Sequence, residues 1–201
     1  MRLVICPGIH DPKLTDRFLA GVSEVWEAAN PRPNPPTVDR VMIFPAHKHP
    51  PFSAIDTFHF LCCQELAGES LVFVSFSAGV VGSIGAAWMW QQIGGQVGAF
   101  IALDGWGVPL GGTFPIHRIS HDRFTHWSSA LLGSGGDSFY ADPSLAKPTK
   151  SIAHLDLWRS PQTAKGWHIR QTTDGIETAT PATAATFLVH LLKRYGVQSV
   201  V

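Results

Sequence analysis

Charge is scarce in this chain. Only 15% of its 201 residues are charged, and 15 basic side chains balance 15 acidic ones, so the net charge is zero. Proteins that bind nucleic acid usually carry a basic patch, and electrostatic membrane anchors carry polybasic runs. The sequence has neither feature, so we expect no nucleic-acid partner and no polybasic anchor. Because 45% of the residues are hydrophobic, disorder is excluded as the main state.

Long apolar runs and paired cysteines are missing too. No stretch reaches the roughly 18 uninterrupted apolar residues of a membrane span, and the apolar start is too short for a secretion signal before Pro7-Gly8. The three cysteines, Cys6 and the pair Cys62-Cys63, lack the spacing of a disulfide framework. These features predict a cytoplasmic protein with reduced thiols. The length predicts one domain over residues 1–201, whereas the oligomeric state is not specified.

Short apolar runs alternate with helical patterns along the chain. Uninterrupted apolar runs are typical of strands covered on both faces, and four are expected: Arg2–Cys6, Arg40–Phe44, Ser70–Phe76 and Gly98–Leu103. Helical spacing predicts four helices: Asp16–Asn30, Ala54–Leu66, Ala78–Gln92 and Pro181–Tyr195. Two further strands are predicted at Pro115–Ser120 and Ile152–Trp158. This order predicts an α/β fold with a doubly wound, mostly parallel sheet of about six strands and helices on both faces.

The most informative segment joins the third predicted strand to the small-residue helix at Ser77. A strand, a sharp turn centred on a serine and a helix form a nucleophile elbow, in which a strained backbone exposes the hydroxyl above the sheet. The positions two before and two after the serine must be small, and they hold Ser75 and Gly79. The motif usually has glycine at both positions, so Ser75 is a departure from it.

On these residues the chain resembles the α/β-hydrolase superfamily over most of its length, as a minimal member without a lid domain. The resemblance implies a serine hydrolase that cleaves a small carboxylic ester or thioester through an acyl-enzyme on Ser77 and needs no cofactor. It also implies an oxyanion hole of backbone N–H groups from Ala78 and from the loop after the first strand, at Ile9 or His10.

Each of the other two members of a catalytic triad has two candidates. The serine needs a histidine as base, itself oriented by a carboxylate, and the family order along the chain is serine, acid, histidine. Asp122, just past a predicted strand, is favoured as the acid, and Asp104, at the end of the fourth predicted strand, is the alternative. His154 is favoured as the base by its spacing from the acid, whereas His168 lies in a Gly-x-His segment that resembles the family's catalytic loop.

Four aromatic residues lie beyond the predicted strand ends. Trp106, Phe124, Trp127 and Trp158 are candidate walls of an apolar substrate pocket. Core packing under long loops would use the same residue types, so both interpretations stay open.

Two other functions also stay open. The segment Ser77-Ala78-Gly79-Val80-Val81-Gly82 differs from the Gly-x-Gly-x-x-Gly dinucleotide fingerprint only at its first position, and Asp104 lies where a ribose-binding acid would belong. The missing first glycine and the place on the third strand argue against this interpretation. A non-catalytic protein of the same fold would use its cleft for binding alone.

Ten histidines raise the question of a metal site. His117, His121, Asp122 and His126 have ligand types at regular spacing. Because Pro115 and the apolar pattern predict a strand and a turn here, the rings would splay apart. We therefore expect no metal site in this segment.

Overall fold

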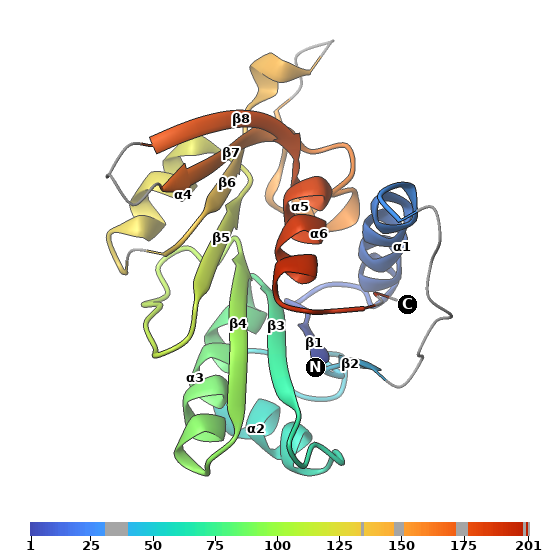
Figure 1. Ribbon diagram of the computed structural model, residues 1–201, viewed down its shortest axis with the longest axis vertical. Coiled ribbons are helices and arrows are strands. Elements are labelled where there is room, and N and C mark those ends of the chain that lie inside the picture. Colours follow the sequence, from blue (N-terminus) through green and yellow to red (C-terminus); the bar gives the residue numbers. More distant parts are fainter. Residues whose placement is uncertain (31–39, 134, 147–150, 172–176, 199, 201) are drawn as a thin grey trace.

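One eight-stranded sheet organises the computed structural model, which describes residues 1–30, 40–133, 135–146, 151–171, 177–198 and 200 (Figure 1). The strands are β1 (Arg2–Cys6), β2 (Val41–Ile43), β3 (Ser70–Phe76), β4 (Gln96–Leu103), β5 (Ile116–Ser120), β6 (Ser138–Ala141), β7 (Lys165–Gln171) and β8 (Glu177–Thr183). The helices are α1 (Lys13–Ala28), α2 (Ala54–Cys62), α3 (Ala78–Gln92), α4 (Arg123–Ala130), the short 3-10 turn η2 (Pro143–Leu145), α5 (His154–Arg159) and α6 (Ala184–Arg194).

The strand order is β2-β1-β3-β4-β5-β6-β7-β8. Strands β1 to β6 pair in parallel, whereas β7 and β8 pair antiparallel. The expected α/β class with a mostly parallel sheet is confirmed. The expected number of about six strands is wrong, because the sheet has eight and ends in an antiparallel part.

One of the missed strands, β8, has a clear physical cause. Strand β8 has an exposed, polar surface at the sheet edge, so it lacks the apolar run of a covered strand. The predicted strand Ile152–Trp158 is also wrong, because helix α5 occupies most of it. In so short a segment, an apolar pattern does not distinguish a strand from a helix. Only Leu157 and Trp158 of α5 are fully buried.

Two hydrophobic cores lie on opposite faces of the sheet, because successive strand residues point to opposite sides. On one face, Leu3 and Ile5 pack with apolar side chains of α1, α5 and α6. On the other face, Val4 and Cys6 pack with those of α2 and α3. Helices therefore cover both faces, as Figure 1 shows for α6 and α3. None of the helices in the described ranges is long and apolar enough to cross a membrane.

The carboxyl ends of three neighbouring strands converge at one edge of the sheet. Strands β3, β4 and β5 lie side by side in parallel, and the residues that follow them are Ser77, Asp104 and His121. Backbone hydrogen bonds continue the ladder past the strand ends, from Ser77 N–H to Leu103 and from Asp104 N–H to Ile119, each 2.9 Å long. The loops after such ends are the usual place for ligands in open parallel sheets.

Candidate active site

Ser77 occupies a strained turn between β3 and α3. Its backbone dihedrals are φ 53° and ψ −123°, a combination that a residue with a Cβ rarely adopts. Ser77 and Asp104 are the non-glycine residues with positive φ in the described part of the chain. The turn lifts the side chain of Ser77 above the sheet, where it lines a cavity. This is the geometry that the sequence predicts for a nucleophile elbow.

The loop after β1 passes close to this turn. A methyl group built on Gly79 would collide with the carbonyl oxygens of Cys6 and Pro7, so glycine is required for this crossing. A methyl group on Gly8 would lie 3.0 Å from the Cβ of Ser77. Because Ala78 is the first residue of α3, its N–H belongs to the first turn, which has no intrahelical acceptor. The chain thus brings the loop after β1 and the N-terminus of α3 to the serine together.

Ser75 is accommodated by a buried polar group beneath the elbow. The Ser83 hydroxyl, one turn into α3, lies 2.7 Å from the Ser75 hydroxyl and 2.6 Å from the Gly79 carbonyl oxygen. The free thiol of Cys6 packs against the same hydroxyls, and burial raises its pKa to about 12. Ser75 therefore fits where the motif usually has glycine, because a small helix residue satisfies its hydroxyl.

Asp104 holds two histidines. Its Oδ2 atom lies 2.8 Å from Nδ1 of His154 and 2.9 Å from Nδ1 of His121, while its Oδ1 accepts the backbone N–H of His121 at 2.9 Å. Burial alone would raise the pKa of Asp104, but the hydrogen bonds from His121 and His154 lower it below its usual value. The carboxylate is therefore ionised at neutral pH and fixed at both oxygens.

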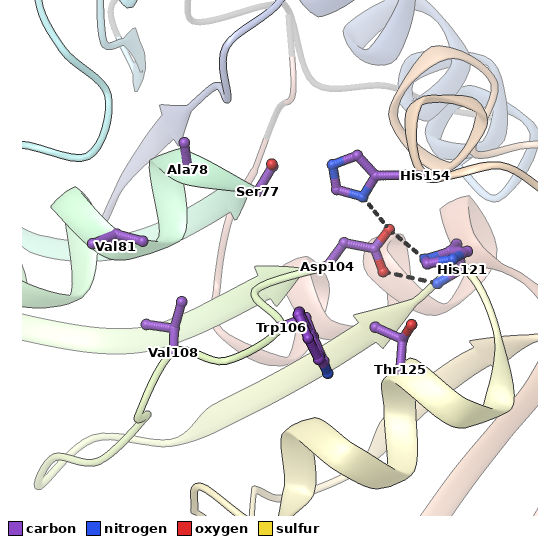
Figure 2. Close-up of a pocket in the computed structure, with 9 residues that line it drawn as sticks. All are labelled: Ser77, Ala78, Val81, Asp104, Trp106, Val108, His121, Thr125 and His154. Carbon is purple, nitrogen blue, oxygen red and sulfur yellow. Dashed lines mark hydrogen bonds and ion pairs between the residues drawn. The ribbon is translucent and has the colours of Figure 1, made fainter.

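His154 lies between Asp104 and Ser77. It is the first residue of α5, and its ring stacks on Phe76 with the centroids 4.6 Å apart. Figure 2 shows Nδ1 facing Asp104 and the other ring nitrogen turned toward the side of Ser77. All three side chains line the same cavity, and within the described residues no hydrogen bond joins the Ser77 hydroxyl to His154.

The favoured acid, Asp122, is placed elsewhere. Its carboxylate caps α4 by accepting the N–H of Thr125 at 2.6 Å, and its Oδ2 lies 3.4 Å from Nε2 of His121. Within the described residues, Asp122 forms no hydrogen bond or ion pair with His154. The alternative from the sequence, Asp104, takes the position beside that histidine.

His168, the alternative base, belongs to a separate cluster on β7. Its Nε2 lies 3.7 Å from Asp137, and its ring packs against Phe187 of α6. Burial lowers its pKa, with a smaller opposing effect from Asp137. Of the two histidines considered from the sequence, His154 is therefore the one placed beside Asp104.

The structure adds His121 to the residues at this edge. Its hydrogen bond to Asp104 raises the pKa of His121, which burial partly opposes. In the sequence, His121 stands out only as part of a regular histidine pattern. The signal that could have found it is its place directly after β5, just as Asp104 directly follows the neighbouring strand β4.

A cavity of about 350 Å³ opens beside Ser77 (Figure 2). Its lining residues come from α3, α4, α5 and the segments after β3, β4 and β5: Ser77, Ala78, Val81, Asp104, Trp106, Val108, His121, Thr125 and His154. Of the four aromatic candidates only Trp106 is among them. Trp158 is fully buried and stacks on Phe18 at 3.7 Å, while Phe124 and Trp127 are exposed on α4.

No protein-family model matches this chain, and a search of the curated proteins finds no significant match. The site must therefore be interpreted from its own geometry. A histidine oriented by a carboxylate, in the same cavity as a serine with a strained backbone, is an arrangement that can perform nucleophilic catalysis.

The glycine pattern that resembled a dinucleotide fingerprint serves packing. Added methyl groups on Gly79 and Gly82 would collide with backbone carbonyls of the loop after β1 and of Pro51. The space above these glycines is thus filled by protein. The Asp104 carboxylate is bound to two histidines, which leaves it poorly placed to bind a ribose.

The histidines of the regular pattern do not converge with one another. His117 contacts the Asp137 carbonyl and Tyr195, while His126 contacts Ser138. Within the described residues, a metal-capable group is found instead at Asp104, His121 and His154, whose ligand atoms all lie within 4.8 Å of one another.

Proposed function

We propose that this protein is a serine hydrolase of the α/β-hydrolase type that cleaves a small carboxylic ester or thioester. The observation that supports the proposal is a strained serine that lines the same cavity as a histidine whose Nδ1 lies 2.8 Å from a buried carboxylate. The proposed nucleophile is Ser77, the base is His154 and the acid is Asp104.

The first half-reaction forms an acyl-enzyme. Nε2 of His154 takes the proton of the Ser77 hydroxyl as Oγ attacks the carbonyl carbon. Asp104 accepts the Nδ1–H bond, which keeps Nε2 unprotonated beforehand and stabilises the imidazolium afterwards. The tetrahedral oxyanion is held by backbone N–H groups of Ala78 and of Ile9 or His10, because the loop after β1 lies against the elbow. Its collapse breaks the ester or thioester bond, and His154 protonates the leaving alcohol or thiol.

The second half-reaction releases the acid. A water molecule gives a proton to His154 and attacks the acyl carbon, and the second tetrahedral intermediate expels Ser77, which recovers its proton from the imidazolium. The side chains of Val81, Trp106 and Val108 give the cavity apolar walls for the acyl or leaving group. A cavity of about 350 Å³ matches a small substrate, since ligand pockets start near 300 Å³.

The test is covalent labelling with a fluorophosphonate probe, followed by intact-mass measurement. We expect one adduct on the wild type and none on Ser77→Ala. His154→Ala and Asp104→Asn should slow labelling about 10²–10⁴-fold, the usual contribution of a general base and its orientation. The matched variants are His168→Ala, which we expect to label at the wild-type rate, and Asp122→Asn, which should slow labelling far less than Asp104→Asn.

Hydrolysis of short p-nitrophenyl esters and thioesters would then rank the substrates. A folded wild type that forms no adduct and cleaves none of these compounds would overturn the proposal and favour a non-catalytic binding protein. Equal slowing by His154→Ala and His168→Ala would overturn the assignment of the base. Thermal melting of every variant establishes that it is folded.

A further inference from the structure

Asp104, His121 and His154 bring one carboxylate and two imidazoles to a single point on the cavity wall. We propose that this cluster, which we call the Asp–His–His cluster, binds a divalent transition-metal ion of the Zn²⁺ type and that the bound ion inhibits the hydrolase. Zinc binding itself does not depend on the proposed activity, whereas the inhibition rests on it.

The distances suit a small ion with nitrogen and oxygen ligands. The two Nδ1 atoms lie 2.8 and 2.9 Å from the same Oδ2, and all three ligand atoms lie within 4.8 Å of one another. Ligand atoms around a tetrahedral zinc ion are about 3.3 Å apart, given bonds of about 2.0–2.1 Å. The two pairs of Oδ2 with Nδ1 therefore need to separate by about half an ångström. The two Nδ1 atoms lie at most 4.8 Å apart, so they need to approach each other by no more than about 1.5 Å. Two imidazoles with one carboxylate are a known zinc set, whereas Mg²⁺ and Ca²⁺ prefer oxygen ligands.

The supporting contacts already hold the ligands in place. The Asp104 side chain is only 1% exposed, and its Oδ1 is fixed by the His121 backbone N–H, which leaves Oδ2 for an ion. Nε2 of His121 lies 3.4 Å from Asp122, so a proton on that nitrogen can face a carboxylate while Nδ1 binds metal. Metal-binding histidines commonly donate their other N–H in this way. His154 is 42% exposed and lines the cavity, so a water molecule can complete the coordination.

The inhibition follows from the proton on His154. In the hydrolase, neutral His154 carries its proton on Nδ1 and uses the lone pair of Nε2 to accept the Ser77 proton. Coordination through Nδ1 uses the lone pair of that atom, so the single proton of the neutral ring moves to Nε2. The atom facing Ser77 then donates a hydrogen bond instead of accepting a proton. The hydrogen bond between Asp104 and His154 is lost at the same time, because Oδ2 of Asp104 also coordinates the ion.

Calorimetric titration of ZnCl₂ into Ser77→Ala tests binding without any hydrolysis. We expect one zinc site in the wild type and in Ser77→Ala. The zinc affinity should fall more than about 10-fold, or be lost, in His121→Ala, and it should fall about 10-fold in Asp122→Asn. The matched control is His126→Ala, whose histidine contacts Ser138 and should leave zinc affinity unchanged. His59→Ala controls for zinc held at the surface, since His59 lies 3.8 Å from the exposed Cys63.

The second arm measures fluorophosphonate labelling of the wild type with ZnCl₂, MgCl₂ or EDTA. We expect zinc to slow labelling, EDTA to restore it and magnesium to have no effect. Zinc affinity that survives His121→Ala but falls in His59→Ala would overturn the proposed site. Zinc binding at the Asp–His–His cluster without slower labelling would overturn the inhibition alone. A wild type that never labels but binds zinc through His121 would overturn the proposed function and leave the metal site standing.

Discussion

Replacing Ser77 by glycine should make the protein more stable than replacing it by alanine. Both variants lack the hydroxyl, so they differ only in the Cβ atom. With φ at 53° and ψ at −123°, position 77 has a backbone conformation that disfavours every residue with a Cβ. Alanine retains this strain, and glycine relieves it. The comparison therefore isolates the backbone cost of the elbow from the chemistry of the side chain.

The size of the effect can be worked from the geometry. Strain of this kind costs about 1–3 kcal/mol. Two effects lower the stability of the glycine variant. Glycine has greater freedom in the unfolded chain, which costs about 0.4–1 kcal/mol, and the packing of one half-buried Cβ is lost, which costs about 0.4 kcal/mol. The net expectation is that Ser77→Gly is about 1 kcal/mol more stable than Ser77→Ala. For a chain of this length, that difference corresponds to a shift of about 2–4 °C in Tm.

Urea unfolding of both variants, followed by circular dichroism, measures this difference. Gly94→Ala calibrates it in the opposite direction, because Gly94 has φ 87° and nothing within 4 Å of an added methyl group. That variant should lose about 1 kcal/mol through backbone strain alone. If Ser77→Gly is no more stable than Ser77→Ala while Gly94→Ala is destabilised as expected, the backbone at the elbow is not strained.

Three further predictions concern the surroundings of the site and the stability of the fold. Gly79→Ala should cost about 1–3 kcal/mol in urea unfolding and abolish probe labelling, because the added methyl group displaces the loop after β1. Ser75→Ala should lower the free energy of unfolding by about 1 kcal/mol but keep the rate of labelling within a few-fold of the wild type, because Ser83 still donates to the Gly79 carbonyl at 2.6 Å. Loss of labelling would show that the reaction depends on the buried Ser75 hydroxyl. Burial would raise the pKa of Asp137, but the hydrogen bond from Arg194 lowers it in the folded protein. The ionised carboxylate therefore stabilises the fold fully above its unfolded pKa of about 4. This stabilisation is lost as the pH falls from there through the lower pKa of the folded state. The stability advantage of the wild type over Asp137→Asn should therefore be full at pH 7 and shrink below about pH 4 in unfolding curves, and a constant difference would contradict the ion pair.

Local patterns were sufficient to predict the central strands and the elbow. The expected ranges Arg2–Cys6, Ser70–Phe76 and Ala78–Gln92 coincide with β1, β3 and α3. These elements are buried on both faces or packed closely, so their composition reflects their position directly. The last third of the chain was harder, because the edge strand β8 is exposed and lacks an apolar pattern.

The acid was harder to predict than the serine for a related reason. Counting strands favours Asp122, the second residue after β5, but its carboxylate caps α4 instead. Asp104 follows β4 directly, with φ 49°, and points at His154. Which of the two reaches the histidine depends on where α5 lies, and α5 is connected to these strands only through tertiary packing. A single sequence contains no local signal for that contact.

The positions of the strained residues support a function for this edge independently of any resemblance. The non-glycine residues with positive φ in the described part of the chain are Ser77 and Asp104, and both directly follow neighbouring parallel strands. Aspartate tolerates the left-handed region better than most residues, but serine at φ 53° and ψ −123° does not lie in that region. Such a conformation persists only where the surrounding structure determines it, and it costs a substantial part of the roughly 5–15 kcal/mol by which a fold is stable. Glycine would adopt this conformation without the strain, so a serine at position 77 supports the proposed role of its hydroxyl as the nucleophile.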